Sequence, residues 1–403
     1  PEPVRVQEAA VKDTEYVLVF DVLGDSVGIT LLRGRRIVRS ALVPWKSDDL
    51  DKQIGRLRKP FEQVQFTRYA PDLAGTLYDK LLAESLKPVP HGSPITIIPD
   101  GALALLPFEA LVVSGKPTWI DGTRGSYPKG LTYVADRYPI SYYQSLTAMT
   151  LVRTLAKKGT HRTRMLVMAD PVFEVSDARF RAQEQPLAGD QDRHAEQSGR
   201  EARGTVLLGV MGLRRLPESE KLAQSMKDLL GPDCQSFTGL ACTKQRFLQT
   251  FNSGTAPYSA VVFGTHGFAA NDLPGVMEPA LAMTMVPRGT DGLLTMTEVA
   301  GLTMDVDTAA LTACKTGLGM RLAGEGVLSM GRAFQAAGTK SVIMSLWSVA
   351  EEPSIALMDE FFRQRAQGRN KLDAWTGARA HIRGLGFEHP FFWASFILVG
   401  ETQ

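Results

Sequence analysis

Short apolar runs that stop at small or turn-forming residues recur through the second half of the chain. Each has the length and continuous hydrophobicity of a strand buried on both faces. The runs cover residues 164–171, 259–267, 308–317, 340–347 and 394–400. Between them lie segments with apolar residues at helical spacing, at 216–231, 243–251, 327–338, 353–365 and 373–383. The alternation predicts an α/β fold with a mostly parallel sheet and helices on both faces.

The first half of the chain has a more mixed pattern. Strand-like runs flank the turn Gly24-Asp25 and predict a hairpin, and an alternating third strand follows. A later buried strand breaks at Pro99-Asp100-Gly101 and resumes as a short helical piece after Pro107. Residues 116–129 are rich in Gly, Pro and Thr and predict a surface loop. The predicted strands are 16–23, 27–32, 36–43 and 94–98, and the predicted helices are 48–57 and 73–82.

Changes in composition divide the chain into regions. Polar residues 1–13 predict a tether, 14–160 an N-terminal lobe and 163–403 a second lobe. Within the second lobe, 174–204 contains almost no large apolar side chain, which predicts a mobile loop. That loop is either a solvated linker or a regulatory or self-cleaved segment. Because Pro1 is neither an initiator Met nor the start of a signal peptide, we expect that the chain was cut from something longer.

Composition narrows the class of protein. Hydrophobic residues make up 44% and charged residues 22% of 403 residues, as in ordinary globular proteins. A net charge of +2 gives no reason to expect a nucleic acid or a membrane surface as partner. No apolar run reaches the roughly 18 residues of a membrane helix. Three scattered cysteines predict neither a disulfide framework nor a metal site, and they favour a reducing cytoplasm.

Two of the predicted strands end in reactive side chains. His266 follows the run at 259–264, and Cys314 follows the run at 308–313. Ligands bind at the carboxyl ends of neighbouring parallel strands, where an imidazole and a thiol suffice for nucleophilic catalysis. The two residues are 48 positions apart (314 minus 266), close to the roughly 50 residues between His and Cys in caspases. Either residue alone would more often be structural.

Ordered motifs around this pair resemble those of the CHAT domain, a caspase-like family associated with TPR repeats. The catalytic motifs are His266-Gly267-Phe268 and Leu311-Thr312-Ala313-Cys314. Upstream lie Pro99-Asp100-Gly101, Leu106-Pro107-Phe108 and Met168-Ala169-Asp170-Pro171. Further blocks are Asp291-Gly292-Leu293, Gly324-Glu325-Gly326, Ser345-Leu346-Trp347 and His389-Pro390-Phe391, so the similarity spans about 15–403.

The resemblance implies a fold and a set of roles. The fold is a caspase-like α/β/α sandwich of three layers, preceded by a β-rich pseudo-caspase lobe. Cys314 is then the nucleophile and His266 the general base, and the N–H groups of Gly267 and Cys314 form the oxyanion hole. No cofactor is implied. An upstream sensor or TPR-type region is expected as the regulator, with a protein as substrate.

Departures from the caspase motif affect specificity. Thr312 stands two residues before Cys314, and no basic pocket for an acidic side chain is evident. Asp170, at the end of its strand, either selects Lys or Arg in the substrate or caps the following turn. Trp347 either walls the groove or fills the core. Glu351, with Glu352, either faces the substrate or is a solvated acid at a helix N-terminus.

The sequence therefore predicts a cysteine endopeptidase that forms an acyl-enzyme and is restrained until its sensor is engaged. A catalytically silent peptide-binding module is the main alternative. A thiol hydrolase or transferase acting on small amides or esters is the third.

Overall fold

The computed structural model describes residues 9–155, 163–184, 213–252, 258–272, 276–287, 290–312, 320–322, 326–328, 330–348 and 350–403. The chain forms two compact units. Unit 1 comprises Pro1–Thr160, Arg321–Leu328 and Lys340–Gln403, and unit 2 comprises His161–Met320 and Ser329–Thr339. The C-terminal strands and helices thus fold with the N-terminal part of the chain.

Unit 1 contains a mixed sheet with the strand order β3-β2-β1-β4-β7-β18-β17. The meander of β1 (Tyr16–Leu23), β2 (Ser26–Arg33) and β3 (Arg36–Pro44) is antiparallel. β4 (Ile95–Ile98) and β7 (Ile140–Tyr142) continue the sheet in parallel with β1. β18 (Phe396–Gly400) is parallel to β7 and antiparallel to β17 (Ser341–Ser345). The predicted hairpin around Gly24-Asp25 is confirmed.

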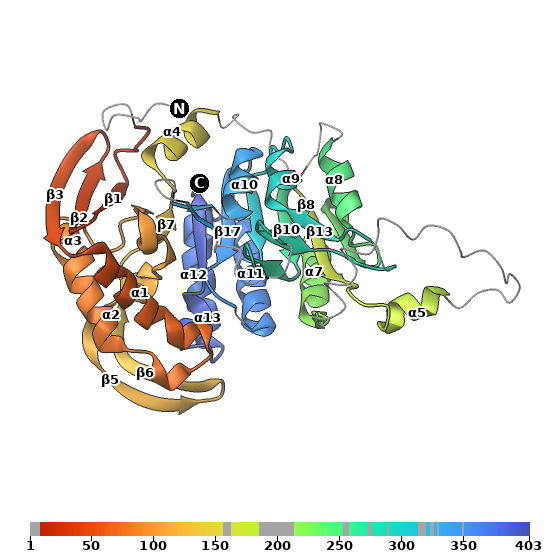
Figure 1. Ribbon diagram of the computed structural model, residues 1–403, viewed down its shortest axis with the longest axis horizontal. Helices are drawn as coiled ribbons and strands as arrows, with labels where there is room; N and C mark the ends of the chain where they lie inside the picture. Colours follow the sequence, from red (N-terminus) through yellow and green to blue (C-terminus); the bar gives the residue numbers. More distant parts are fainter. Residues whose placement is uncertain are drawn as a thin grey trace, which may run out of the picture. The chain divides into compact units, whose positions relative to one another are not determined.

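The predicted surface loop over 116–129 is wrong, because this region forms a long two-stranded ribbon (Figure 1). Its strands are β5 (Val112–Gly122) and β6 (Gly125–Tyr133). Most side chains of β5 are exposed, so the alternation of buried and solvent-facing residues that identifies a strand is lost. Register shifts near Gly115 absorb the irregular residues that suggested a loop.

The helices of unit 1 surround an aromatic interior. Trp347, Trp375 and Trp393 are fully buried, and Phe61 of α1 stacks on Trp347 with ring centroids 4.7 Å apart. Ala9 and Val11, within the segment predicted as a tether, are also buried, in a cluster with Tyr143. The helices are α1 (Ser47–Glu62), α2 (Pro71–Tyr78), α3 (Glu84–Leu86), α4 (Leu146–Leu155), α11 (Glu351–Ala366), α12 (Lys371–Gly384) and α13 (Pro390–Trp393).

Short helical turns complete unit 1. The buried strand β4 ends just before Pro99-Asp100-Gly101, as predicted, and the turns η3 (Gly101–Leu105), η4 (Phe108–Ala110) and η5 (Val134–Asp136) come after it. Before β4 lie the turn η1 (Phe66–Arg68) and the π-helical turn η2 (Asp79–Ala83), which links α2 to α3. α12 begins at Asn370, whose side chain accepts a hydrogen bond from the Asp373 N–H.

Unit 2 contains a parallel sheet with the order β14-β10-β8-β9. Its strands are β8 (Arg164–Pro171), β9 (Cys234–Gly239), β10 (Tyr258–Gly264) and β14 (Thr308–Leu311). Every paired strand of this sheet is parallel to its neighbour, so the strand ends meet at one edge. A small antiparallel sheet of β11 (Gly267–Phe268), β12 (Ala280–Ala282) and β13 (Leu293–Thr295) follows β10.

The helices of unit 2 connect its strands, as the alternating pattern predicts (Figure 1). Gly338 ends α10 with φ of 106°, and a Cβ at this position would lie 2.2 Å from the Met304 carbonyl oxygen. The predicted loop over 174–204 begins with the short helix α5, and its remainder lies outside the described residues. The helices are α5 (Ala178–Glu184), α7 (Pro217–Leu230), α8 (Lys244–Asn252), α9 (Met296–Ala300) and α10 (Met330–Ala336), with the turn η6 (Gly231–Asp233).

The short strands β15 (Met320–Leu322) and β16 (Gly326–Leu328) pair with each other.

Candidate active site

His266 follows directly on the end of β10, and its backbone is held on both sides. A Cβ at Gly264 would lie 2.5 Å from the Ser219 Cβ, so only glycine lets α7 pack this closely against the strand end. The buried Thr265 hydroxyl donates to the Ala282 carbonyl, and the Ala282 N–H donates to the His266 carbonyl at 2.9 Å. These bonds to β12 fix the direction in which the imidazole leaves the chain.

The imidazole of His266 is partly buried against Phe173, with ring centroids 5.2 Å apart. Its Nε2 lies 2.8 Å from the Arg214 carbonyl oxygen, which can only accept, so Nε2 carries the proton and donates it. Burial lowers the pKa of His266 below its ordinary value, and the Arg214 hydrogen bond opposes that shift. The neutral ring therefore presents Nδ1 as an acceptor, which a general base requires.

Gly267 presents its backbone N–H away from β12. The register pairs Gly267 with Leu281, and the flanking bond runs from the Ala282 N–H to the His266 carbonyl. In an antiparallel ladder this is the pattern of a non-hydrogen-bonded pair, whose N–H groups point away from the partner strand. The Gly267 N–H therefore keeps its capacity to donate to a bound group.

β14 runs beside β10 and ends next to the strand that carries His266. Leu311 is in register with Phe263, and Thr312 donates its N–H (3.0 Å) and its hydroxyl (2.7 Å) to the Phe263 carbonyl. Thr312 is thus anchored to the neighbouring strand. Cys314, two positions further along the sequence, lies outside the described residues.

Asp170 ends β8 with a fully buried side chain. Its φ of 46° lies in the left-handed region, and its N–H donates to the Ser219 hydroxyl at 2.9 Å. Two arginines bind its carboxylate: Arg179 Nη1 and Arg215 Nη2 each lie 2.7 Å from Oδ2. Arg215 also donates from Nε at 3.0 Å, so it approaches the carboxylate with two nitrogens. The carboxylate therefore already has cationic partners.

The side chains around Asp170 differ in exposure. Arg179 is 25% exposed and is also paired with Asp177, which contributes most to raising its pKa. Arg215 is 46% exposed and reaches Glu220 at 2.7 Å. The hydrogen bond to Asp170 is the main cause that raises the pKa of Arg215. The cluster could not be predicted from sequence: Arg179 follows Asp170 by 9 residues and Arg215 follows it by 45, and nothing in that spacing indicates a contact.

Trp347 lies in the interior of unit 1. Its side chain is 1% exposed, it stacks on Phe61, and its indole N–H donates to the Phe391 carbonyl at 3.1 Å. This placement favours the prediction that Trp347 fills the core over the prediction that it contacts a substrate.

Glu351 begins α11 in unit 1, together with Glu352. Both acids occupy the first turn, where negative charge is favoured by the helix dipole. Glu352 forms two hydrogen bonds with Arg124, at 2.5 and 2.7 Å. The positions match the predicted acids of a helix N-terminus.

The other two cysteines are poor nucleophiles. Cys234 and Cys242 are free thiols, and both are buried. Burial raises the pKa of each thiol, most strongly at Cys242, where the Asp170 carboxylate adds to the effect. A thiolate is the reactive form of cysteine, so neither side chain is suited to attack a carbonyl.

Reasoning from sequence missed Arg214, Arg215 and Arg179. Arg214 and Arg215 come just before the helix predicted at 216–231. In a parallel sheet, the loop that follows one strand passes the end of the neighbouring strand, and this was the signal that could have placed them near the site. His266 contacts the backbone carbonyl of Arg214 and not its side chain. Residue type does not predict such a backbone contact.

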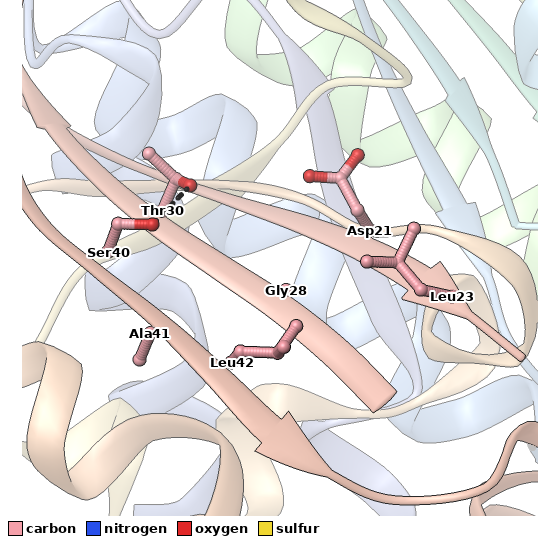
Figure 2. A pocket seen from close by; sticks show the side chains of 7 residues that line it. All are labelled: Asp21, Leu23, Gly28, Thr30, Ser40, Ala41 and Leu42. Atoms are coloured by element: carbon pink, nitrogen blue, oxygen red, sulfur yellow. Dashed lines mark hydrogen bonds between the residues drawn. The ribbon is translucent and has the colours of Figure 1, made fainter. Parts of the chain in front are cut away.

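Two cavities lined by described residues lie in unit 1. One of about 380 Å³ sits on β1–β3, and Figure 2 shows the Thr30 and Ser40 hydroxyls side by side in its lining. Asp21 also lines it, and burial, then repulsion from Asp100, raises the pKa of this carboxyl. A second, of about 820 Å³, is bordered by Trp45 and Lys80. Neither set of lining residues includes an imidazole or a thiol.

Within the described part of the chain, no group of acidic, histidine and cysteine side chains is arranged to hold a metal ion. None of the helices among those same residues combines the length and apolar character of a membrane span.

Comparison with known proteins gives a family and a fold. A model described as the CHAT domain matches residues 71–401. Human tetratricopeptide repeat protein 28 is 25% identical over 217 residues, which are 46% of this chain and 8% of that protein. The mouse protein of the same name is 25% identical over 215 residues and 9% of its length. The chain therefore spans less than a tenth of these curated relatives.

Among solved structures, separase from Saccharomyces cerevisiae in complex with securin superposes with a TM-score of 0.53 at 12% identity. The match covers 96% of this chain and 30% of that one. Gingipain R, an arginine-specific cysteine proteinase, gives a TM-score of 0.44 at 10% identity, over 88% of this chain and 73% of its own. The family match and the separase fold confirm the predicted resemblance and the caspase-like α/β fold class.

Proposed function

Because the chain belongs to the family of CHAT domains, we propose that it is a cysteine endopeptidase that cleaves proteins through Cys314 and His266. The observation that carries the proposal is the register of β10 and β14. Phe263 and Leu311 are partners on these parallel strands. His266 comes three positions after Phe263, and Cys314 comes three positions after Leu311. Because both residues lie three positions beyond a pair of neighbouring strand residues, the register favours a base and a nucleophile at the same edge of the sheet.

The chemistry follows from the state of the imidazole. Nδ1 of neutral His266 takes the Cys314 thiol proton, and the thiolate attacks the carbonyl carbon of the scissile bond. The oxyanion accepts hydrogen bonds from the N–H groups of Gly267 and Cys314. The imidazolium returns the proton to the leaving amine, which leaves a thioester on Cys314. A water then loses a proton to His266, attacks the thioester and releases the acid and the thiol.

Two features of the described residues support this assignment. The Gly267 N–H points away from β12, as a donor to an oxyanion must. The thiols of Cys234 and Cys242 are buried and have raised pKa values, so Cys314 is left as the cysteine suited to act as nucleophile.

Substrate contacts remain part of the proposal. Thr312 would help to form the wall of the site beside the nucleophile, and Asp170 would select Lys or Arg. Glu351, the first residue of α11, would contact the substrate. Trp347 would fill the core, because its side chain is buried.

Regulation by an upstream TPR-type region is supported by the relatives. The proteins that match nearly half of this chain are named for tetratricopeptide repeats and extend far beyond the matched part. We propose that such a region, or a partner that replaces it, restrains the peptidase until a signal arrives. A protein is then the substrate, in a cytoplasmic setting.

The test is the identification of cleavage sites in a proteome-derived peptide library by mass spectrometry. Wild-type chain is compared with Cys314→Ala, His266→Ala and the matched thiol control Cys234→Ala. Wild type and Cys234→Ala are expected to cleave peptides. Cys314→Ala and His266→Ala are expected to cleave none, although their melting temperatures equal that of wild type. Full hydrolysis by Cys314→Ala would overturn the mechanism. Peptide binding without hydrolysis would favour the catalytically silent module. Turnover confined to small esters would favour the thiol hydrolase.

A further inference from the structure

A four-residue segment, Leu213–Leu216, lies over His266 and ends at the N-cap of α7. Leu213 packs against the apolar cluster of Phe173, Ala282 and Met285. The Arg214 carbonyl accepts the hydrogen bond from His266 Nε2, and the Arg215 guanidinium binds the Asp170 carboxylate. Three consecutive residues thus make three different kinds of contact with the site.

The Asp170–Arg215 contact has the form in which a carboxylate recognises a guanidinium. Nε and Nη2 of Arg215 lie 3.0 and 2.7 Å from Oδ2, and Nη2 also reaches Glu220. Charged hydrogen bonds in this forked geometry select arginine over other side chains. Asp170 is fully buried and cannot bind another cation at these positions while Arg215 is there.

Arg215 is nevertheless held in a way that permits exchange. Its side chain is 46% exposed, so water reaches the guanidinium and screens part of its attraction to Asp170. Arg179 is more deeply buried and is also tied to Asp177 through two nitrogens. Of the two guanidiniums on Asp170, Arg215 is therefore the one that an incoming cation can replace.

We propose that Arg215 is an internal occupant of a guanidinium-binding site at Asp170, and that an arginine or lysine side chain of a substrate displaces it. Displacement moves the segment that carries Arg214, so the carbonyl leaves His266 at the same step. Occupation of the site by substrate and release of the imidazole are then one event. This inference rests on the proposed function for its catalytic meaning, although the exchange itself can be measured without catalysis.

Arg215 competes with the substrate's basic side chain for Asp170. Its effective concentration is high, because it is part of the same chain. A basic substrate replaces one guanidinium with another cation at Asp170. A peptide with a neutral residue at the cleaved position does not displace Arg215, so the segment Leu213–Leu216 stays over the site and excludes it.

The ring nitrogens of His266 report the exchange directly. Selective ¹⁵N-histidine labelling of the full chain, with the His266 signals assigned by His266→Gln, separates a protonated Nε2 from an unprotonated Nδ1. Wild type is expected to give two distinct shifts, since the Arg214 carbonyl fixes one tautomer. Arg215→Gln is expected to bring the two shifts together, because the released ring exchanges tautomers. Arg181→Gln, an exposed arginine of α5, is the matched control and should keep the wild-type shifts.

Nα-acetyl-arginine methylamide at millimolar concentration should move the wild-type signals toward those of Arg215→Gln, and Nα-acetyl-leucine methylamide should not. His266 shifts that are identical in wild type and Arg215→Gln, or that ignore the arginine probe, would overturn the proposal. Arg215→Lys, which keeps the charge, provides a second variant in case the first is poorly folded.

Peptide cleavage separates this inference from the proposed function. Arg215→Gln should raise kcat/KM for a peptide with arginine at the cleaved position by roughly tenfold, and for a leucine peptide by less. A fall in both rates would show that Arg215 positions the base and does not block the site. If the shifts change as expected while no variant cleaves any peptide, the exchange stands and the peptidase function fails.

Discussion

Two carboxylates, Glu109 in unit 1 and Asp170 in unit 2, are fully buried and bound by arginine, yet their surroundings differ. Glu109 is held by Tyr142 at 2.5 Å and by Arg379 at 2.8 Å. Arg379 is only 7% exposed, whereas Arg215 on Asp170 is 46% exposed. The first arrangement is closed to solvent and suits a fixed structure. The second has a partner at the surface that can leave.

The histidines of the two units differ in the same way. In unit 1, His389 uses both ring nitrogens: Nδ1 accepts the Phe391 N–H at 3.0 Å and Nε2 donates to the Phe66 carbonyl at 3.2 Å. In unit 2, His266 uses Nε2, and the described residues provide no bond to its Nδ1. A buried imidazole with both ring nitrogens in hydrogen bonds stabilises a fold. An imidazole with one ring nitrogen still able to accept a proton can take part in catalysis.

The largest expected effect is on stability, from breaking the closed carboxylate pair. Arg379→Met leaves Glu109 buried without its cation and should lower the free energy of unfolding by about 3–5 kcal/mol. Arg215→Gln should lower it by about 1 kcal/mol or less, since Arg215 is 46% exposed and Arg179 remains paired with Asp170. All five tryptophans lie in unit 1, so their fluorescence in a urea titration follows that unit. Amide hydrogen exchange of α7 reports the stability of unit 2. If both variants lost the same free energy of unfolding, the two carboxylate sites would not differ in the way described.

Acid should weaken unit 1 through His389. Burial lowers the pKa of His389 to about 4, from an ordinary value of 6.5 in the unfolded chain. Between these values the unfolded state binds a proton that the folded state does not, so stability falls as pH drops from 6.5 to 4. The loss should approach about 3 kcal/mol and level off below pH 4. His389→Asn keeps an acceptor for the Phe391 N–H and should flatten this part of the pH profile, as measured by urea unfolding at each pH.

Activity should persist to lower pH than an ordinary histidine base allows. Because burial lowers the pKa of His266, the imidazole stays unprotonated below pH 6.5. The acidic limb of kcat/KM, which reports the free enzyme, should therefore fall below that value. Peptide cleavage measured from pH 4.5 to 8 checks this. A limb at or above pH 6.5 would show that the partly buried ring does not act as the base in its neutral form.

The smallest effect is expected at Thr312. Thr312→Val removes the hydroxyl that donates to Phe263 but keeps the backbone bond to the same carbonyl. Stability should fall by about 1 kcal/mol, the usual net value of one hydrogen bond. Thr312→Ser retains the donor and should behave like wild type in thermal unfolding. Equal behaviour of the two variants would mean that the hydroxyl does not anchor the end of β14.

Much of the fold could be predicted because it depends on local patterns. Strands such as β10 and β14 are continuous apolar runs, and helices such as α7 combine helical spacing with early acids and a following glycine. The ribbon β5–β6 escaped prediction because an exposed strand carries no hydrophobic alternation. The antiparallel pairing of β17 with β18 also went unpredicted, since both strands are buried and give the same pattern in either direction.

The position of His266 just after a buried strand could be predicted from the sequence, whereas the contacts that support its ring could not. His266 was found because a reactive residue follows a buried strand. Its contact with Arg214 uses a backbone carbonyl, which every residue possesses. The contact of Asp170 with Arg179 and Arg215 depends on how α5 and the segment before α7 fold back. Such contacts arise from tertiary structure, so residue type and spacing do not reveal them.

The most direct test of the central claim is the rate at which iodoacetamide alkylates Cys314, resolved by mass spectrometry in the folded chain. This rate depends on thiolate content and needs neither a substrate nor an activating signal. If His266 is the base, Cys314 should react at pH 7 faster than Cys234, and His266→Gln should slow it by about tenfold. Alkylation of Cys314 at the same rate in wild type and His266→Gln would contradict the proposed catalytic pair.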